Sequence, residues 1–323
     1  ATEGNFNNLI GVPLTVLAAP PDAEVWVLEM GSNAPGEIAR LAAIAEPDDA
    51  LITTIGPAHL EGFGDESGVL REKLALVRAA RPAGSVVVGE KPSLLGRSAR
   101  EIRADARVAG LDDDADWRPD RWGIDATTCW FERGGTRYVV PAGGEHHLRD
   151  AILAAAMAEA IGVSSAGVSG GIAQYRPVGM RGALRQLGEL TIVADCYNAN
   201  PESFAAAIDY CVKAFPGRRL AAVVGSMLEL GAHSNLAHEE VARSLVEAGF
   251  AQVVALGDFG PAFERLSAAA NGTRVERASS AASAVEAIAA RLTGDEVILV
   301  KASRGERLER VIEGLEARFG EGS

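Results

Sequence analysis

Short apolar runs alternate with amphipathic stretches along most of this chain, and that alternation limits the fold more than any other feature. The runs "EVWVLEM" (24–30), "ALITTIG" (50–56) and "SVVVGE" (85–90) have the length and composition of buried strands. Between them, "PGEIARLAAIA" (35–45) and "GVLREKLALVRAA" (68–80) space their apolar residues as a helix with one buried face does. This order predicts a parallel sheet covered by helices.

The middle of the chain differs, and it precedes a second series of strands. "TTCWFERGGTRYVVP" (127–141) predicts a β-hairpin with a Gly-Gly turn, and an Ala-rich helix is predicted at 150–162. We place a domain boundary near residue 184, so the expected fold is α/β with two domains, residues 1–184 and 185–323. The strands expected in the second domain are "TIVADC" (191–196), "RLAAVVGSM" (219–227), "QVVALGD" (252–258) and "EVILVKAS" (296–303).

Composition excludes several classes of protein. The 323 residues carry 31 Lys and Arg against 44 Asp and Glu, a net charge of −13, which disfavours binding to nucleic acid or to an anionic membrane. Three cysteines without paired spacing argue against a disulfide framework or a zinc site. No apolar run is long enough for a membrane span, and no secretory leader is recognisable. A cytoplasmic protein without membrane insertion is expected.

Several polar residues follow predicted strands, where open parallel sheets bind their ligands. Each also has an ordinary structural interpretation. A carboxylate at a strand end often caps a helix or forms a surface ion pair, and a histidine among glycines can satisfy a turn. A lysine on an amphipathic helix usually belongs to a solvated face. The residues in question are Glu29, His59, Asp195 and Lys301 at strand ends, and Lys73 on the helix.

Six motifs in a fixed order are far more specific than any one of them. They are "GNFNNLIGVPLT", "EMGSNAPGEI", "GPAHLEGFG", "DCYNANPESF", "GSMLELG" and "LVKASRGERLERV". The set resembles the Mur ligase family from the first residue to about residue 315, and "EMGSNAPGEI" and "GPAHLEGFG" resemble members that add D-Ala-D-Ala. Family members have a UDP-binding domain, a central ATPase domain and a C-terminal domain. The resemblance implies that residues 1–184 are the central, parallel-sheet ATP-binding domain and residues 185–323 a Rossmann-like α/β C-terminal domain.

The phosphate loop that the family places shortly before "ATEGNFNN" is not in this sequence, because no G-x-x-x-x-G-K-[ST] motif occurs. We therefore expect the chain to be truncated at its N-terminus, without the UDP-binding domain and the start of the ATPase domain, and to be inactive by itself. The alternative is a natural protein that lacks the loop.

The resemblance also implies a reaction and its participants. ATP phosphorylates the terminal carboxylate of UDP-N-acetylmuramoyl-tripeptide, and the amine of D-Ala-D-Ala attacks the acyl phosphate to form an amide. The step belongs to peptidoglycan precursor synthesis, and through it to cell-wall biogenesis, cell shape and cell division. ATP and Mg²⁺ are the expected cofactors, and a monomer is expected.

The family's metal ligands match Glu29 and His59 in this sequence. Lys73 matches a lysine that several members carry as a carbamate, an anion able to support a second Mg²⁺. A free lysine has a pKa near about 10.4, so carbamate formation needs surroundings that favour the neutral amine. Glu29, His59 and Lys73 are therefore the expected metal site, with His59 and Lys73 also expected to be catalytic.

Other positions are carried over from the family motifs. Substrate-facing residues are expected at Asn5, Asn7 and Asn8, which match a loop facing the muramoyl-peptide, and at Lys301, Ser303 and Arg304, which match the segment receiving the dipeptide or the stem peptide. Nucleotide contacts are expected at Asp150, Arg181, Asp195 and Asn198. Ordinary alternatives are an ion pair for Arg181, a turn for Asn198 and Asn200, and a helix N-cap for Ser303.

The sequence departs from the family pattern at a few positions. Asp150 stands where an Asn is expected near the adenine, and an ionised carboxylate accepts hydrogen bonds but cannot donate them. Ser226 replaces a usual Asp, Ala302 a usual Gly and Cys196 a common Ser. Two other functions stay open: a non-catalytic relative that binds a partner or peptide, and an unrelated nucleotide-binding α/β protein.

Overall fold

The computed structural model describes residues 2, 6–56, 60–177, 179–266 and 272–320, and every structural statement below concerns these residues. Contacts divide the chain into two compact units. Unit 1 comprises Ala1–Arg121, Glu132–Arg137 and Arg149–Gly171, and unit 2 comprises Trp122–Phe131, Tyr138–Leu148 and Ile172–Ser323. The predicted α/β class with parallel sheets is confirmed. The domain boundary near residue 184 stays a prediction.

Unit 1 is built around a parallel sheet of three strands in the order β1-β2-β3. All four residues of the central strand are buried, as its unbroken apolar run predicts. The helices α4 and α5 pack on this sheet, and α1 and α2 pack on each other. The bounds are β1 (Ala50–Ile52), β2 (Val86–Gly89), β3 (Arg107–Ala109), α1 (Gly11–Ala18), α2 (Glu37–Ala45), α3 (Leu60–Phe63), α4 (Glu66–Ala79) and α5 (Ser93–Ile102).

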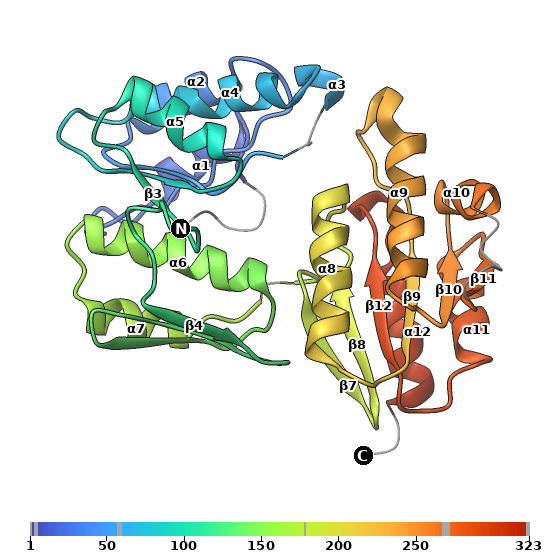
Figure 1. Cartoon of the computed structure of the whole chain (residues 1–323). Coiled ribbons are helices and arrows are strands. Elements are labelled where there is room, and N and C mark those ends of the chain that lie inside the picture. Colours follow the sequence, from blue (N-terminus) through green and yellow to red (C-terminus); the bar gives the residue numbers. More distant parts are fainter. Residues whose placement is uncertain (1, 3–5, 57–59, 178, 267–271, 321–323) are drawn as a thin grey trace. The chain divides into compact units, whose positions relative to one another are not determined.

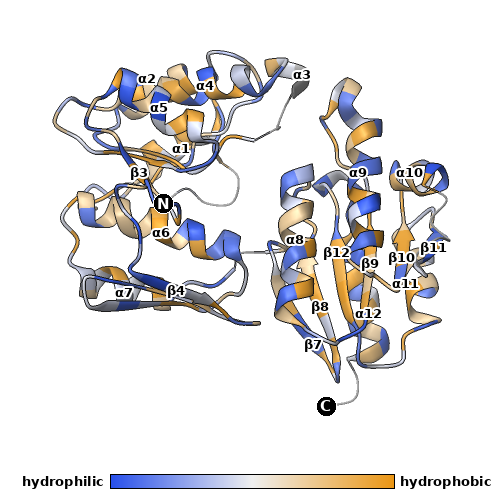
Figure 2. Ribbon diagram, viewed as in Figure 1, coloured by the Kyte–Doolittle hydropathy of each residue, from blue (hydrophilic) through white to orange (hydrophobic). Residues whose placement is uncertain are grey.

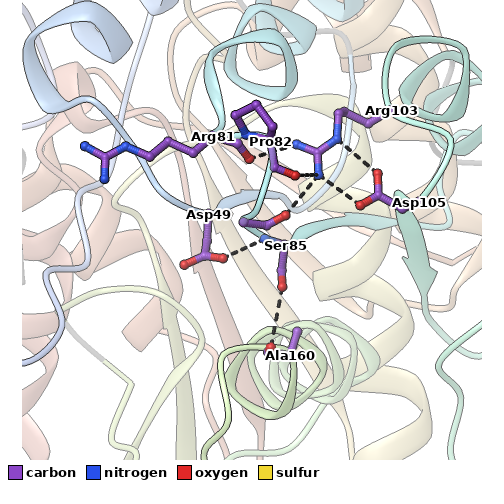
Figure 3. Close-up of polar contacts among 8 residues, drawn as sticks. Asp49, Arg81, Pro82, Ser85, Arg103, Asp105 and Ala160 are labelled. Carbon is purple, nitrogen blue, oxygen red and sulfur yellow. Dashed lines mark hydrogen bonds and ion pairs between the residues drawn. The ribbon is translucent and has the colours of Figure 1, made fainter.

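One arginine fixes the turn that leads from α4 into β2. Figure 3 shows the Arg103 guanidinium directed at the carbonyl oxygens of this turn, to which it donates hydrogen bonds, while Asp105 accepts two more on the other side. The backbone N–H of Ser85 donates to Asp49 at 2.7 Å, which ties the start of β2 to the end of the segment before β1. Loop carbonyls that would otherwise need water therefore have protein partners.

The predicted strand at 24–30 is wrong, because the structure has no strand there. Val25 and Val27 are 57% and 64% exposed, and the carbonyl of Val27 accepts one backbone hydrogen bond, from Thr2 at 3.1 Å. A strand exists only where a neighbouring backbone completes the ladder, and an apolar run cannot supply that neighbour.

The predicted hairpin is confirmed in a second three-stranded sheet, ordered β4-β5-β6. Gly134 and Gly135 form its turn with φ of +56° and +80°, the positive values that a two-residue hairpin turn requires. The predicted Ala-rich helix is also present, beginning earlier than expected, at Glu145. The bounds are β4 (Arg121–Ile124), β5 (Cys129–Arg133), β6 (Thr136–Val140), α6 (Glu145–Ala160) and α7 (Ser165–Ala173).

Unit 2 holds a six-stranded sheet in the order β11-β10-β9-β12-β8-β7 (Figure 1). Its strands are parallel except β7, which runs antiparallel to β8 at one edge. The four strands predicted from the sequence are present, whereas the edge strands β7 and β11 were not predicted. The bounds are β7 (Ala183–Leu187), β8 (Leu190–Asp195), β9 (Leu220–Val224), β10 (Gln252–Ala255), β11 (Arg274–Arg277) and β12 (Val297–Lys301).

Helices cover both faces of this sheet, so its central strands are mostly apolar, as Figure 2 shows for β9, β10 and β12; the exceptions, Gln252 and Lys301, lie at strand ends. Alternate residues of β12 enter different cores: Val297 and Leu299 pack with α8, α9 and α10, whereas Ile298 and Val300 pack with α11 and α12. The bounds are α8 (Pro201–Ala214), α9 (Ser234–Glu247), α10 (Phe259–Arg265), α11 (Ala281–Ala289) and α12 (Glu309–Phe319). No helix in the described parts of the chain is long and apolar enough to cross a membrane.

Candidate active site

Two of the predicted strand-end residues of unit 2 meet in a buried ion pair. β8 and β12 pair in parallel with Asp195 opposite Lys301, and the Lys301 Nζ lies 2.5 Å from the Asp195 Oδ2. The lysine is 1% exposed and also donates to the carbonyl of Asn198 at 3.3 Å. A buried ammonium is tolerated when a carboxylate and further acceptors surround it. The charge of Lys301 is therefore used to hold the loop that follows β8.

Ser303 links three loops and does not cap a helix. Its Oγ accepts a hydrogen bond from the N–H of Leu228 at 3.0 Å and donates to the carbonyl of Ala199 at 3.4 Å. The short 3₁₀ helix that follows, Arg304–Glu306, receives no side-chain cap bond, so the helix-cap interpretation of Ser303 is wrong. Ser303 joins the loops after β8, β9 and β12, all at the carboxyl edge of the sheet.

The two asparagines of "DCYNANP" differ in role. Asn200 is the N-cap of α8, where its side chain accepts from the N–H of Ser203 at 2.7 Å and the Ser203 hydroxyl accepts in return from the N–H of Asn200. Asn198 is exposed, and its side-chain oxygen accepts from the N–H of Ala199 at 2.9 Å. Neither side-chain amide nitrogen forms a hydrogen bond with a described residue, and Asn198 is the more exposed of the two.

Arg181 and Arg304 come together on one aromatic ring. The guanidinium carbons of Arg181 and Arg304 lie 4.3 Å and 5.0 Å from the ring centroid of Tyr197. Sequence reasoning assigned the two arginines to different ligands and missed Tyr197, although this residue lies inside the quoted motif. The ion pair offered as the alternative for Arg181 does not occur within the described part of the chain.

In unit 1, Asn7 holds the carboxylate of Glu29. The Asn7 side-chain amide donates to the Glu29 Oε1 at 2.8 Å, and the backbone carbonyl of Asn7 accepts from the N–H of Gly31 at 2.7 Å. A Cβ on Gly31 would lie 2.9 Å from the end of the Asn7 side chain and would displace the amide that holds Glu29. Asn8 has a different role, since its side-chain oxygen accepts from the N–H groups of Ile10 and Gly11 at the start of α1.

Lys73 is half-buried, so the solvated-face interpretation is wrong. Its Nζ donates to the hydroxyl of the buried Ser32 at 3.2 Å. Burial lowers the pKa of Lys73 below its ordinary value, and the nearby carboxylates of Glu72, Glu29 and Glu37 oppose that shift. A lowered pKa favours the neutral amine of Lys73.

Glu72, beside Lys73 in the sequence, was not singled out and has a structural role. Its two carboxylate oxygens accept from the N–H groups of Gly36 and Ile38, each at 2.7 Å, at the start of α2. Glu37 accepts from the N–H groups of Asn33 and Ala34. Carboxylates therefore hold the "EMGSNAPGEI" loop. The Gly, Asn and Pro residues of this motif indicate a turn, but they do not indicate the carboxylates that fix it.

Of the expected metal ligands, Glu29 and Lys73 lie among the described residues. Glu29 offers a hard oxygen ligand, because its Oε2 is uncommitted among the described residues. His59 and Asn5 lie outside the described residues, and within those that are described no group of three His, Cys, Asp or Glu side chains could hold a metal. Carbamylation would make Lys73 the second oxygen ligand. Asp150 lies exposed on α6, in the turn after His146.

Comparison with known proteins places the chain in a family. Residues 1–158 match the Mur ligase middle domain, and residues 180–304 match the Mur ligase glutamate ligase domain. The chain is 31% identical over 318 residues to the UDP-N-acetylmuramoyl-tripeptide--D-alanyl-D-alanine ligase of Bacillus subtilis (strain 168), covering 97% of this chain and 69% of that protein. The ligase of the same name from Escherichia coli (strain K12) is 30% identical over 331 residues, covering 98% of this chain and 70% of the relative.

Solved structures agree with the sequence comparison. MurF from Acinetobacter baumannii superposes with a TM-score of 0.87 at 28% identity, covering 98% of this chain and 70% of that one. The MurF ligase from Thermotoga maritima in complex with ADP has a TM-score of 0.86 at 26% identity, covering 100% of this chain and 74% of that one. With both domain matches in the expected order and this similarity over nearly its whole length, the chain belongs to the Mur ligase family of ATP-dependent amide ligases.

Proposed function

We propose that this protein adds D-Ala-D-Ala to UDP-N-acetylmuramoyl-tripeptide in an ATP-dependent step of peptidoglycan precursor synthesis. The observation that carries the proposal is the similarity of 97% of the chain to a ligase of that name, at 31% identity. The ADP bound to the Thermotoga maritima relative supports ATP as the nucleotide substrate. A cytoplasmic location and a monomeric state stay predictions from the sequence.

The reaction has two chemical steps. The terminal carboxylate of the tripeptide attacks the γ-phosphorus of ATP, which gives an acyl phosphate and releases ADP. The amine of D-Ala-D-Ala then attacks the acyl carbon, loses a proton, and displaces inorganic phosphate. The main physical difficulty is charge, because an anionic carboxylate must approach a polyanionic nucleotide in a protein whose net charge is −13.

We propose that residues of this chain offset the repulsion between the carboxylate and the nucleotide. Arg181 and Arg304 supply positive charge at the carboxyl edge of the unit 2 sheet. Asp195, Lys301 and Ser303 hold the loops at this edge. Asn198 presents its amide to the nucleotide. The segment from Lys301 to Arg304 receives the dipeptide. Glu29, oriented by Asn7, and a carbamylated Lys73 would hold Mg²⁺, which neutralises phosphate oxygens when bound. His59 is proposed as a further ligand.

The test is an assay of the complete gene product with all three substrates. Amide formation is followed by mass spectrometry of the UDP-linked product, and phosphate release is followed in parallel. Product that requires ATP, the UDP-linked tripeptide and D-Ala-D-Ala is expected. Binding of the tripeptide without any product would instead favour a non-catalytic, Mur-ligase-like binding protein.

Residues 1–323 alone are expected to show no measurable turnover. They contain no phosphate loop, whose backbone N–H groups and lysine provide most of the stabilisation of the transferring phosphate. A phosphate-release assay on the purified 323-residue chain checks this, with the Bacillus subtilis relative as a positive control. Ordinary turnover by the chain alone would contradict the expectation.

A further inference from the structure

Two arginines of unit 2 share one aromatic ring, and neither pairs with a carboxylate of the described residues. The guanidiniums of Arg181 and Arg304 lie 4.3 Å and 5.0 Å from the Tyr197 ring centroid. Both side chains are exposed, and neither forms an ion pair with any described carboxylate. Many described arginines form an ion pair with Asp or Glu, among them Arg100, Arg149 and Arg318, as expected for a chain with 44 acidic residues. Arg181 and Arg304 are instead two neighbouring cations whose shared partner is an aromatic ring.

Backbone contacts bring the three side chains together. The N–H of Tyr197 donates to the carbonyl of Met180 at 3.1 Å, which places the next residue, Arg181, beside the ring. On the other side, Ser303 donates to the carbonyl of Ala199 at 3.4 Å, which anchors the residue that precedes Arg304. The ring contacts therefore follow from an anchored backbone.

Cation–π attraction fits a positioning role for the ring. The face of a tyrosine attracts a guanidinium and restricts its orientations, while all five N–H donors stay available at the edge of the group. Two guanidiniums on one ring repel each other, and an anion between their edges would remove that repulsion. The arrangement is thus more favourable with an anion than without one.

We propose that Arg181, Tyr197 and Arg304 form an arginine clamp that binds one phosphate group, with Tyr197 as its positioning residue. A phosphate presents three or more oxygens in a tetrahedral arrangement and carries more negative charge than a carboxylate, so it can accept bidentate hydrogen bonds from two guanidiniums that approach from different sides. The inference rests on the proposed function for the source of the phosphate, a nucleotide or an acyl phosphate. It joins two arginines that the sequence assigned to different ligands.

The experiment measures binding of inorganic pyrophosphate to the 323-residue chain by isothermal titration calorimetry. Variants are Y197L, which removes the ring, Y197F, which keeps it, and R181A and R304A, which each remove one cation. Arg310 is an exposed arginine on α12 outside the clamp, so R310A is the matched charge control. Circular dichroism verifies that each variant is folded. D-Ala-D-Ala is titrated in parallel as a carboxylate ligand.

We expect R181A and R304A each to weaken pyrophosphate binding about tenfold or more, the effect of losing a charge-assisted hydrogen bond. Y197L should weaken it about two- to fivefold for each arginine it releases, and Y197F and R310A should change it less than about twofold. In a chain that already carries R181A and R304A, Y197L should have no further effect, since Tyr197 acts only through the two arginines.

Three results would overturn the clamp. The first is no measurable binding of pyrophosphate to the unaltered chain, and the second is an equal loss from R310A, which would mean unspecific charge attraction. The third is D-Ala-D-Ala binding that depends on the arginines while pyrophosphate binding does not, which would make the site a carboxylate site. None of these readouts requires turnover, so failure of the clamp and failure of the proposed ligase activity are distinguishable.

Discussion

At the scale of single residues, Glu29 and Lys73 are held in different surroundings. Glu29 is exposed, and the Asn7 amide orients its carboxylate by donating to Oε1 at 2.8 Å. Lys73 is half-buried, and burial lowers the pKa of its ammonium, which favours the amine that reacts with CO₂. The predicted metal site therefore depends on how each side chain is oriented and desolvated.

Replacing Glu29 tests the metal ligand. Glu29→Ala should lower turnover of the complete gene product by roughly 10²-fold or more, because one preorganised charge-stabilising group is lost. Turnover as a function of Mg²⁺ concentration is the measurement, with direct Mn²⁺ binding by electron paramagnetic resonance as a second readout. Glu24→Ala, an exposed carboxylate five residues earlier, is the control. Near-normal turnover at limiting Mg²⁺ would remove Glu29 from the site.

Replacing Lys73 separates a carbamate from an ordinary cation. Lys73→Ala should abolish activity, and added short-chain carboxylic acids should partly restore it, because a carbamylated lysine supplies a carboxylate. Lys73→Arg should be inactive, since a guanidinium keeps the positive charge. Turnover with and without acetate is measured for each variant. An active Lys73→Arg enzyme would discard the carbamate and leave the Glu29 prediction standing.

At the scale of elements, the loop before α2 depends on a carboxylate supplied by another helix. The Glu72 side chain on α4 accepts two backbone N–H groups at 2.7 Å at the start of α2. Such groups have no partner inside the helix, and a carboxylate there also interacts favourably with the positive end of the helix dipole. The contact fixes the loop that runs from Glu29 to α2, and it does so from the residue adjacent to Lys73.

Glu72→Gln should reduce the free energy of unfolding by about 1–3 kcal/mol, because the amide can accept only one of the two hydrogen bonds well. Chemical denaturation followed by circular dichroism is the measurement. Glu101→Gln on α5, an exposed position, should change stability by less than about 0.5 kcal/mol. Equal effects of the two substitutions would refute the capping role of Glu72.

At the scale of the whole molecule, stability should fall in acid partly through one buried histidine. His147 on α6 is 5% exposed, and its Nδ1 lies 3.3 Å from the hydroxyl of Tyr175. Burial, with a smaller effect of His146, lowers the pKa of His147 to about 3 from an ordinary 6.5. Between these two values the unfolded chain binds a proton that the folded chain does not, so stability decreases as the pH falls from 6.5 toward 3.

His147→Asn should flatten that dependence. The free energy of unfolding of the unaltered chain should fall more steeply between pH 6.5 and 4 than that of the variant, with a difference on the order of a few kcal/mol. Denaturant titrations at several pH values provide the data. His233→Gln replaces an exposed histidine and should leave the slope unchanged. Parallel curves for His147→Asn and the unaltered chain would show that His147 does not contribute.

The sequence by itself determined the elements whose pattern is local. The apolar run 297–300 predicts a strand buried on both faces, and the structure has it. The Gly134-Gly135 turn was predictable because only glycine adopts two successive positive φ values at low cost. The ordered motifs were enough to predict the family, since each preserves residue types at fixed short spacings.

Only the tertiary structure decided which side chains meet. Asp195 and Lys301 are 106 residues apart and pair because β8 and β12 are neighbours in register. Tyr197 joins Arg181 and Arg304 because hydrogen bonds between loops bring three distant segments to one edge of the sheet. Conversely, residues 24–30 have the composition of a strand and form none. A local sequence pattern indicates which face of a segment can be buried. A hydrogen-bond ladder, an ion pair or the arginine clamp also needs a partner segment, and the packing of the whole chain determines that partner.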